Sequence, residues 1–339
     1  MHKPCFVTVV LLVGLFAESS FAQQPLELDL VTIGSPGNRP TIASEVPDRP
    51  DWQAGSVGYE YRMMRTELTV AQHFEFAQAY LQFNPQAIAD SGLLGPSLAR
   101  TLDDQLVMFP ETANMPSEMS WHMTARLCNW YHNGKVNAAW AFETGAYDTS
   151  TFVQLPDGSR LDQLTRSPDA RYWIPSINEW IKAVYYDPNR YGTGLEGYWR
   201  QPNGTNEMLI SGYPLDGGQT NAGWGVDFYQ MDVGQYPQVQ SPWGLLDVSG
   251  GRTEWSEGLY GSYATHRTVV GSTQGALSYL WVDPLEGFVR FDVPPDIARY
   301  GIRLATVIPA PGSGFLLIAC AITVGARRRR CGHAKDTSR

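Results

Sequence analysis

Two carboxylates, Asp247 and Glu254, lie seven residues apart in a segment that contains Gly250 and Gly251. A turn of this length can bring both side chains to one hard cation, with backbone carbonyl groups between them completing the coordination. Calcium prefers this all-oxygen chemistry. The alternative is that both carboxylates cap turns and pair with Arg252 or another basic side chain. The residues alone therefore indicate either a calcium site or a purely structural turn.

The cysteines leave little scope for thiol chemistry. Cys5 falls in an apolar N-terminal segment, and Cys320 and Cys331 fall in the C-terminal tail, so Cys128 stands alone in the central part of the chain. A single cysteine forms neither a disulfide within the domain nor a thiolate cluster for zinc. We expect Cys128 to pack on the apolar face of a helix, as lone cysteines usually do.

Two further patterns are not expected to form sites. The sequence at 192–197 fits G-x-G-x-x-G, but it follows a predicted helix instead of a strand, which argues against a dinucleotide site. His122 and His132 lie ten residues apart at opposite ends of one predicted helix, so we do not expect them to bind a metal jointly.

Three helices are predicted by their capping residues and apolar spacing. They span Thr69 to about Leu81, Ser120 to Asn133, and Ser176 to Tyr186. The first and third begin with capping boxes, Thr69 with Gln72 and Ser176 with Glu179. The second ends at Asn133-Gly134, a helix stop signal. The residues expected to face the core are Val70, Phe74, Ala77 and Leu81 in the first helix, Trp121, Ala125 and Cys128 in the second, and Ile177, Trp180, Ile181 and Val184 in the third.

Both ends of the chain differ from its centre. Residues 1–22 have Lys3, an apolar run and a small-residue end, as in a secretory signal peptide. Residues 23–52 are predicted to be an extended leader with one strand at 26–33, and residues 53–306 a single domain. Residues 307–339 contain an apolar stretch, 312–326, followed by four arginines, which mark a cytoplasmic flank. The stretch is short for a membrane span, so a buried core helix is the alternative.

The exported part of the chain is acidic. Without residues 1–22 and 307–339, 18 basic and 32 acidic residues remain, a formal net charge of −14. Such a domain repels phosphate backbones, so we expect no nucleic-acid partner, whereas divalent cations are plausible ones. From residue 59 onward the chain is rich in Trp, Tyr, Gly and turn pairs such as Asn203-Gly204. This composition favours an irregular, loop-rich α+β domain.

Five segments, in order along about 245 residues, resemble the formylglycine-generating (sulfatase-modifying factor) family. They are 61–69 (YRMMRTELT), 116–134 (PSEMSWHMTARLCNWYHNG), 174–180 (IPSINEW), 241–255 (SPWGLLDVSGGRTEW) and 301–305 (GIRLA). The resemblance implies the irregular C-type-lectin-like fold of that family. The C-terminal tail is similar to a PEP-CTERM sorting signal, with Ala310 where that signal usually has Glu. That resemblance implies an exosortase-type processing enzyme, with the tail either cleaved or kept as an anchor.

The resemblance also implies site residues. In this family the turn at 247–254 binds calcium through two side chains, here Asp247 and Glu254, and two carbonyl groups, here those of Gly250 and Arg252. A second family calcium site has its nearest equivalents in Asn221 and Asp227, with solvated turn residues as the alternative. The family's copper-dependent catalysis needs two thiols after a segment that resembles residues 269–273, and no cysteine follows there before the tail.

We therefore expect no catalytic residue and no catalytic cofactor in this chain. The expected function is that of an exported, non-catalytic domain of the periplasm, cell surface or extracellular matrix. Structural calcium would brace it, and it would bind a carbohydrate or an envelope protein, with its C-terminal segment in the membrane at least transiently. The alternative is a divergent formylglycine-generating oxidoreductase acting on sulfatase-like substrates.

Overall fold

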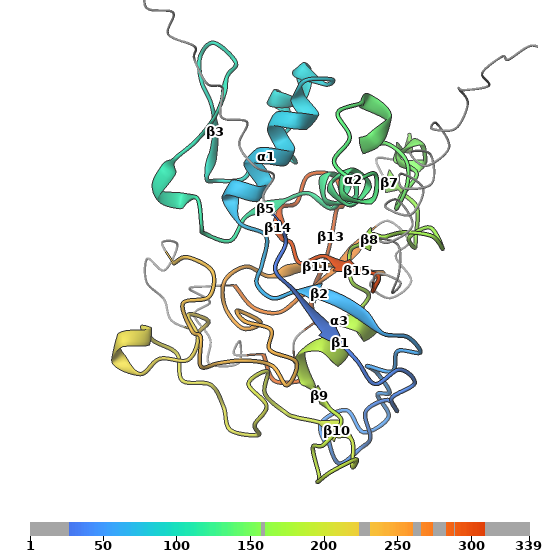
Figure 1. Cartoon of the computed structure of the whole chain (residues 1–339), viewed down its shortest axis with the longest axis vertical. Coiled ribbons are helices and arrows are strands. Elements are labelled where there is room, and N and C mark those ends of the chain that lie inside the picture. The colour runs from blue at the N-terminus through green and yellow to red at the C-terminus, as the bar shows by residue number, and fades with distance from the viewer. Residues whose placement is uncertain are drawn as a thin grey trace, which may run out of the picture.

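The computed structural model describes residues 27–156, 160–223, 231–259, 266–273, 283–287 and 289–308. Within these ranges the chain is a mixed α+β structure with few helices and several small sheets, as predicted (Figure 1). The signal-peptide segment 1–22 and the apolar stretch 312–326 lie outside the described residues. Among the described residues, no helix is long and apolar enough to cross a membrane.

The three predicted helices are present with their predicted caps. They are α1 (Val70–Leu81), α2 (Trp121–His132) and α3 (Ile177–Tyr185), and their N-caps are Thr69, Ser120 and Ser176. Both capping boxes are formed, because the side chains of Gln72 and Glu179 accept from the cap backbones. Short 3-10 helices cover Pro85–Ala89, Pro110–Thr112, Ala139–Phe142, Thr149–Thr151 and Pro214–Asp216.

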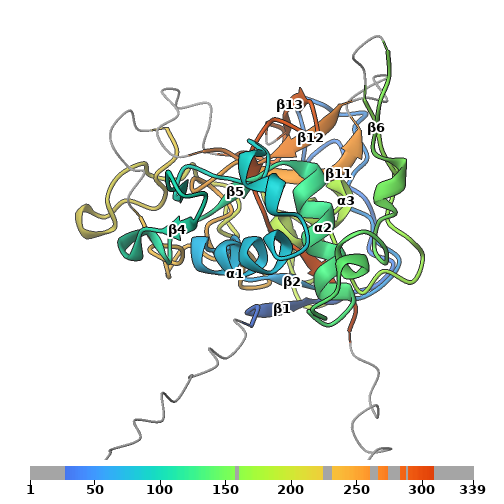
Figure 2. The same ribbon diagram turned by 90° about the horizontal axis from the view of Figure 1, so that it is seen from above.

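The buried face of α1 differs from the prediction. Phe74 and Leu81 are only partly buried, whereas His73, Phe76 and Tyr80 are buried together with Val70 and Ala77. The reason lies in the packing of α1 beside α2, which Figure 2 shows from above. Phe76 stacks on Tyr80, and both rings contact Phe142, which itself stacks on Trp130 of α2. Because Phe76 and Tyr80 pack in this aromatic cluster, the face of α1 that they occupy is buried, and not the face that carries Phe74 and Leu81. In α2, Cys128 is buried as predicted.

Two sheets form the centre of the molecule. The first has the order β1-β2-β15-β8 and the second β13-β12-β11-β14-β5, and the pairs β9/β10, β3/β4 and β6/β7 stand apart. The strands are β1 (Leu30–Ile33), β2 (Tyr61–Met64), β3 (Leu98–Arg100), β4 (Leu106–Met108), β5 (Glu118–Met119), β6 (Val153–Gln154), β7 (Arg160–Leu161), β8 (Tyr172–Trp173), β9 (Tyr186–Asp187), β10 (Gly197–Tyr198), β11 (Glu254–Leu259), β12 (Arg267–Val270), β13 (Val289–Val293), β14 (Tyr300–Gly301) and β15 (Ala305–Thr306).

The described part of the leader packs into the same core as the domain. Strand β1 pairs antiparallel with β2 over four residues, and Ile33 and Val46 are fully buried. Sequence positions far apart thus meet in one sheet, since β2 also pairs with β15 near the end of the described chain. The closing segment that contains β14 and β15 thereby brings Arg303 into the centre of the molecule.

Candidate functional site

Glu254, the first residue of β11, is buried against two partners. One carboxylate oxygen, Oε1, accepts from Nε of Arg303 at 2.9 Å, and the other, Oε2, accepts from the indole N–H of Trp180 at 2.8 Å. Glu254 and Arg303 are both almost completely buried. Both oxygens of one predicted calcium ligand therefore already have hydrogen-bond partners.

Arg303 joins this pair to the surrounding backbone. Its guanidinium donates to the carbonyl oxygens of Met64, Arg65 and Leu246 at 2.7–3.0 Å. A planar guanidinium can satisfy several acceptors at once in this way. Arg303 thus connects the end of β2, the turn before Asp247 and the start of β11.

Asp247 lies on the other side of the turn in a left-handed backbone conformation, with φ of 54°. Its Oδ2 accepts from the N–H of Gly234 at 2.6 Å. Burial raises the pKa of Asp247 to about 6, although the Gly234 amide and the charge of Arg303 oppose the shift. A cation bound beside such a buried carboxyl group favours its ionised form and lowers its pKa again.

A third carboxylate, that of Glu67, lies at this turn and was not predicted from the sequence as a site residue. This residue lies between β2 and α1, its side chain is fully buried, and its Oε1 accepts from the N–H of Arg252 at 2.8 Å. Its Oε2 is buried and has no hydrogen-bond partner among the described residues. Burial, together with the charge of Glu254, raises the pKa of Glu67 well above its usual range. The available signal was its place in residues 61–69, one of the segments that carry the family resemblance, directly before the predicted helix at Thr69.

The other predicted ligands are distributed around this turn. The N–H of Gly250 donates to Ser272 Oγ at 3.0 Å, and that of Arg252 donates to Glu67. Asn221 is buried, and its Oδ1 accepts from the N–H of Gly251 at 2.9 Å. Asp227 lies outside the described residues. Asn221 and Asp247 are thus brought together, whereas the Glu254 carboxylate is turned toward Arg303.

A cavity of about 10 Å³ lies beside these side chains. The residues that line it include Glu67, Asn221, Met231, Asp232, Tyr236 and Asp247, but not Glu254. A space of this size holds about one water molecule or one ion. Within the described ranges, no group of three His, Cys, Asp or Glu side chains has an arrangement suited to holding a metal. Any ion here would rely on amide, carbonyl and water oxygens as well as carboxylates.

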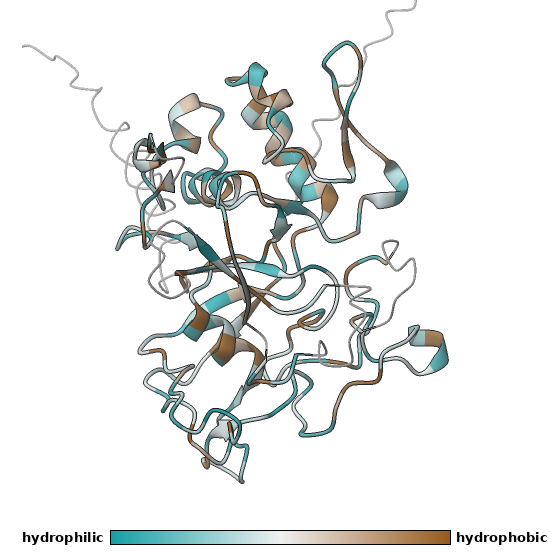
Figure 3. Cartoon of the chain, turned by 180° about the vertical axis from the view of Figure 1, so that it is seen from behind, coloured by the Kyte–Doolittle hydropathy of each residue, from teal (hydrophilic) through white to brown (hydrophobic). Residues whose placement is uncertain are grey.

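A second hollow, a groove of about 940 Å³, lies between two loops. Residues 213–219 form one side, and Met231 and residues 235–239 form the other. The turn at 214–216 projects from the side of the molecule in Figure 1 and carries both apolar and hydrophilic residues in Figure 3. Leu215 is 100% exposed and Tyr213 is 47% exposed. Asp216 is the only charged residue among the described residues that line the groove.

The two loops are joined to each other and to the carboxylate turn. Tyr236 donates its hydroxyl hydrogen to the carbonyl of Gly212 at 2.8 Å, which ties one side of the groove to the other. Thr220 donates to the carbonyl of Ser249 at 2.9 Å. Met231 and Tyr236 line both the groove and the small cavity. The groove and the cavity therefore share a wall.

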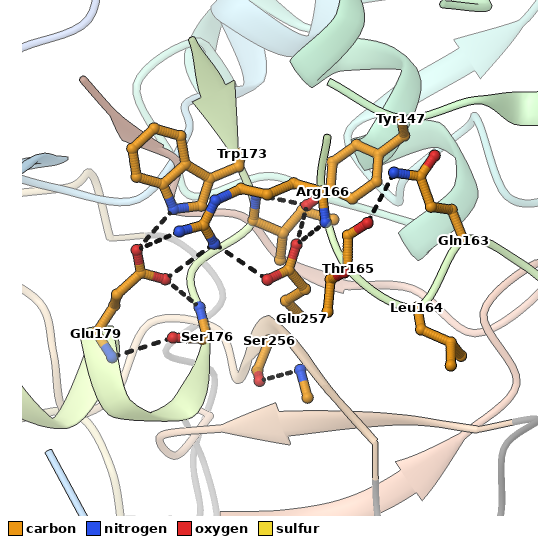
Figure 4. Close-up of polar contacts among 12 residues, drawn as sticks. Tyr147, Gln163, Leu164, Thr165, Arg166, Trp173, Ser176, Glu179, Ser256 and Glu257 are labelled. Carbon is orange, nitrogen blue, oxygen red and sulfur yellow. Dashed lines mark hydrogen bonds and ion pairs between the residues drawn. The ribbon is translucent and has the colours of Figure 1, made fainter. Parts of the chain in front are cut away.

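A third polar cluster surrounds Arg166 (Figure 4). Its guanidinium lies 3.0 Å from Glu179 and 3.0 Å from Glu257, and it covers the ring of Trp173 at 4.3 Å. Glu257 also accepts from the hydroxyl of Tyr147 at 3.0 Å. Burial raises the pKa of Glu257, and the charge of Arg166 opposes that rise. Since the two carboxylates share one arginine and further donors, the cluster is a structural brace for the start of α3.

The remaining sequence patterns have structural roles. The glycine-rich segment 192–197 leads into β10, which pairs with β9 as a hairpin, so it does not open a helix. His122 lies 3.5 Å from Asp162 and stacks on Phe152, whereas His132 accepts from the N–H of Arg171. The two histidines therefore have separate partners.

No protein-family model matches the sequence, and no curated protein matches it. The crystal structure of CarF is a weak structural neighbour, with 20% sequence identity and a TM-score of 0.45 over 84% of this chain and 99% of that chain. A TM-score of this size does not establish a common fold.

Proposed function

We propose that this chain is an exported, non-catalytic binding domain of the formylglycine-generating (sulfatase-modifying factor) type, with the C-type-lectin-like fold of that family. In this proposal the groove between residues 213–219 and 235–239 binds a carbohydrate. The observation that carries the proposal is the groove itself, which is open, built by loops, and lined by an exposed aromatic ring beside amide side chains.

The side chains along the groove suit a sugar. Tyr213 offers a ring face for the C–H groups of a pyranose, and Leu215 extends the apolar surface. The amides of Gln235 and Gln238 each have both donors and acceptors, which match the hydroxyl groups of a sugar. Both glutamines are exposed.

The charge of the groove also favours a neutral ligand. No Lys or Arg occurs among the described residues that line it, and Asp216 gives it a negative charge. A phosphorylated or carboxylated ligand would gain no ion pair there and would be repelled by the acidic domain. A neutral glycan is therefore preferred over an anionic one, and a protein partner is the alternative outcome of the test.

The calcium brace belongs to the same proposal. Its predicted ligands were Asp247, Gly250, Arg252 and Glu254, with Asn221 and Asp227 in a second site. The hydrogen bonds of Glu254 to Arg303 and Trp180 do not favour that residue as a ligand. The buried, unpaired oxygen of Glu67 beside Asp247 and Asn221 does fit a hard cation. When bound, calcium would neutralise these carboxylates and hold the turn, with no role in a reaction.

The enzymatic alternative is a divergent formylglycine-generating oxidoreductase. Cys128, the one cysteine of the described residues, is buried in α2, and burial raises the pKa of its thiol well above the usual value. A thiol with a raised pKa stays protonated at neutral pH, and the protonated form is a poor nucleophile and a poor metal ligand. The non-catalytic function is therefore proposed first.

The experiment is a glycan array probed with the exported part of the chain, residues 23–306. The matched variants are Tyr213→Ala in the groove and Trp140→Ala, which removes an exposed aromatic ring outside the groove. We expect the wild type and Trp140→Ala to retain the same neutral glycans and Tyr213→Ala to bind them about five- to tenfold more weakly, since one stacked ring contributes about 1–1.5 kcal/mol. Equal retention by all three proteins would place the ligand elsewhere, and retention of no glycan would reject the carbohydrate.

A further inference from the structure

We propose that the calcium ion of the brace lies in the small cavity between Glu67 and Asp247, with Glu67 instead of Glu254 as its second carboxylate ligand. The inference rests on the proposed calcium brace and specifies its position. It also assigns the ion a role in holding one wall of the groove.

One oxygen of the buried Glu67 carboxylate has no partner among the described residues. This residue is 0% exposed, and its Oε2 has no hydrogen-bond partner within the described part of the chain although it lines the cavity. A buried polar atom without a partner is costly and is rare in native proteins. An ion in the adjoining space supplies the missing partner.

The charge around the cavity also favours a cation. Arg303 forms its ion pair with Glu254. Among the described residues, no basic side chain lies within ion-pair distance of Glu67 or Asp247, and the charge of Arg303 acts on both from farther away. Three buried carboxylates thus share one guanidinium, which leaves an excess of negative charge beside the cavity. Carboxylates close together in a buried site are stabilised by a bound cation more than by water.

The cavity has the lining and the size that suit a single hard cation. Besides the two carboxylates, Asn221, Asp232 and Ser249 contribute to its lining, so oxygen atoms predominate among the polar groups. These are hard ligands, as calcium requires. The volume of about 10 Å³ leaves room for one small occupant.

The two glycines of the turn keep this arrangement in place. Gly250 and Gly251 both have left-handed backbones, with φ of 88° and 59°. A Cβ atom at residue 250 would collide with Oδ1 of Asn221, and one at residue 251 would collide with Oε2 of Glu67. Only glycine therefore lets the turn approach the two oxygen atoms that line the cavity.

The ion also has a structural connection to the groove. Met231 and Tyr236 line both the cavity and the groove, and Tyr236 donates to Gly212 on the opposite loop. An ion that fixes the cavity wall thereby fixes the positions of residues 231–239. Ligand binding in the groove is then calcium-dependent, although the ion does not line the groove.

The test uses calcium and terbium with the full chain. Thermal melting is measured after chelation and after addition of calcium, and terbium luminescence is excited through Tyr236, which lies in the cavity wall. The variants are Glu67→Gln, which removes the charge with little change in shape, and Glu254→Gln, which alters the carboxylate paired with Arg303. We expect calcium at one hundred times Kd to raise the wild-type Tm by about 5–10 °C.

Glu67→Gln should lose this rise and weaken terbium binding by at least about tenfold. Glu254→Gln should melt lower than the wild type but keep the calcium response and the terbium signal. If Glu254→Gln does not fold, Glu118→Gln, outside the cavity, serves as the charge-matched control. A wild type without any calcium response rejects the brace itself. A calcium response that survives in Glu67→Gln rejects only the position of the ion.

Discussion

Replacing Arg303 by methionine should destabilise the protein strongly. The change removes a fully buried guanidinium whose Nη2 lies 2.8 Å from Glu254 and which donates to three backbone carbonyl groups. Methionine fills a similar length of space without charge. Glu254 would then be a buried carboxylate beside Glu67 with no basic partner among the described residues.

The magnitude follows from the burial of the pair. Removing one partner of a buried ion pair costs about 3–5 kcal/mol, because the other charge is left uncompensated. In a domain of this size each kcal/mol lowers Tm by roughly 2–4 °C. Arg303→Met should therefore melt about 6–20 °C below the wild type.

The assay is calorimetric melting of the wild type, Arg303→Met and a surface control. The control is Arg100→Met, because Arg100 pairs with Asp104 while 43% and 58% of the two side chains are exposed. Removing such a pair changes stability by less than about 1 kcal/mol. An Arg303→Met protein that melts within 3 °C of the wild type would refute the reasoning.

Three further outcomes are expected. His73 is fully buried and burial lowers its pKa to about 4, so its own contribution to stability should fall by up to about 3 kcal/mol as pH drops from about 6.5 toward 4. Burial raises the pKa of Asp247 and of Glu67, which act in the opposite direction, so the measurement is the difference in pH slope between the wild type and His73→Gln in urea melts. Copper and a sulfatase-type cysteine peptide should give no formylglycine product with residues 23–306, and a loss of cysteine mass would favour the enzymatic alternative. Intact-mass analysis of envelope-derived protein should find a chain that ends near residues 309–312, and a species that still carries Arg339 would indicate a retained anchor.

The helices were predictable because their signals are local. Thr69 with Gln72 and Ser176 with Glu179 form their capping boxes within four residues, so spacing alone specifies the start of each helix. Local spacing did not predict which face of α1 is buried. His73 and Tyr80 are buried because α1 packs beside α2, and that partner is set by the tertiary fold.

The candidate site was only half predictable for a related reason. Asp247 and Asn221 were predicted as ligands of two separate calcium sites, whereas in the structure both line one cavity. Glu67 contacts Arg252 across 185 positions of sequence, and Glu254 contacts Arg303 across 49. Local spacing holds no information about such contacts. The groove was missed because its walls are loops, whose shape depends on hydrogen bonds such as that of Tyr236 to Gly212.

The most direct test of the proposed function is hydrogen–deuterium exchange with and without a glycan retained on the array. The account predicts slower amide exchange in residues 210–219 and 231–239 when the glycan is bound, because these segments form the two sides of the groove. The segment around Trp140 should be unchanged. Protection confined to that segment, or absent from both sides of the groove, would contradict the account.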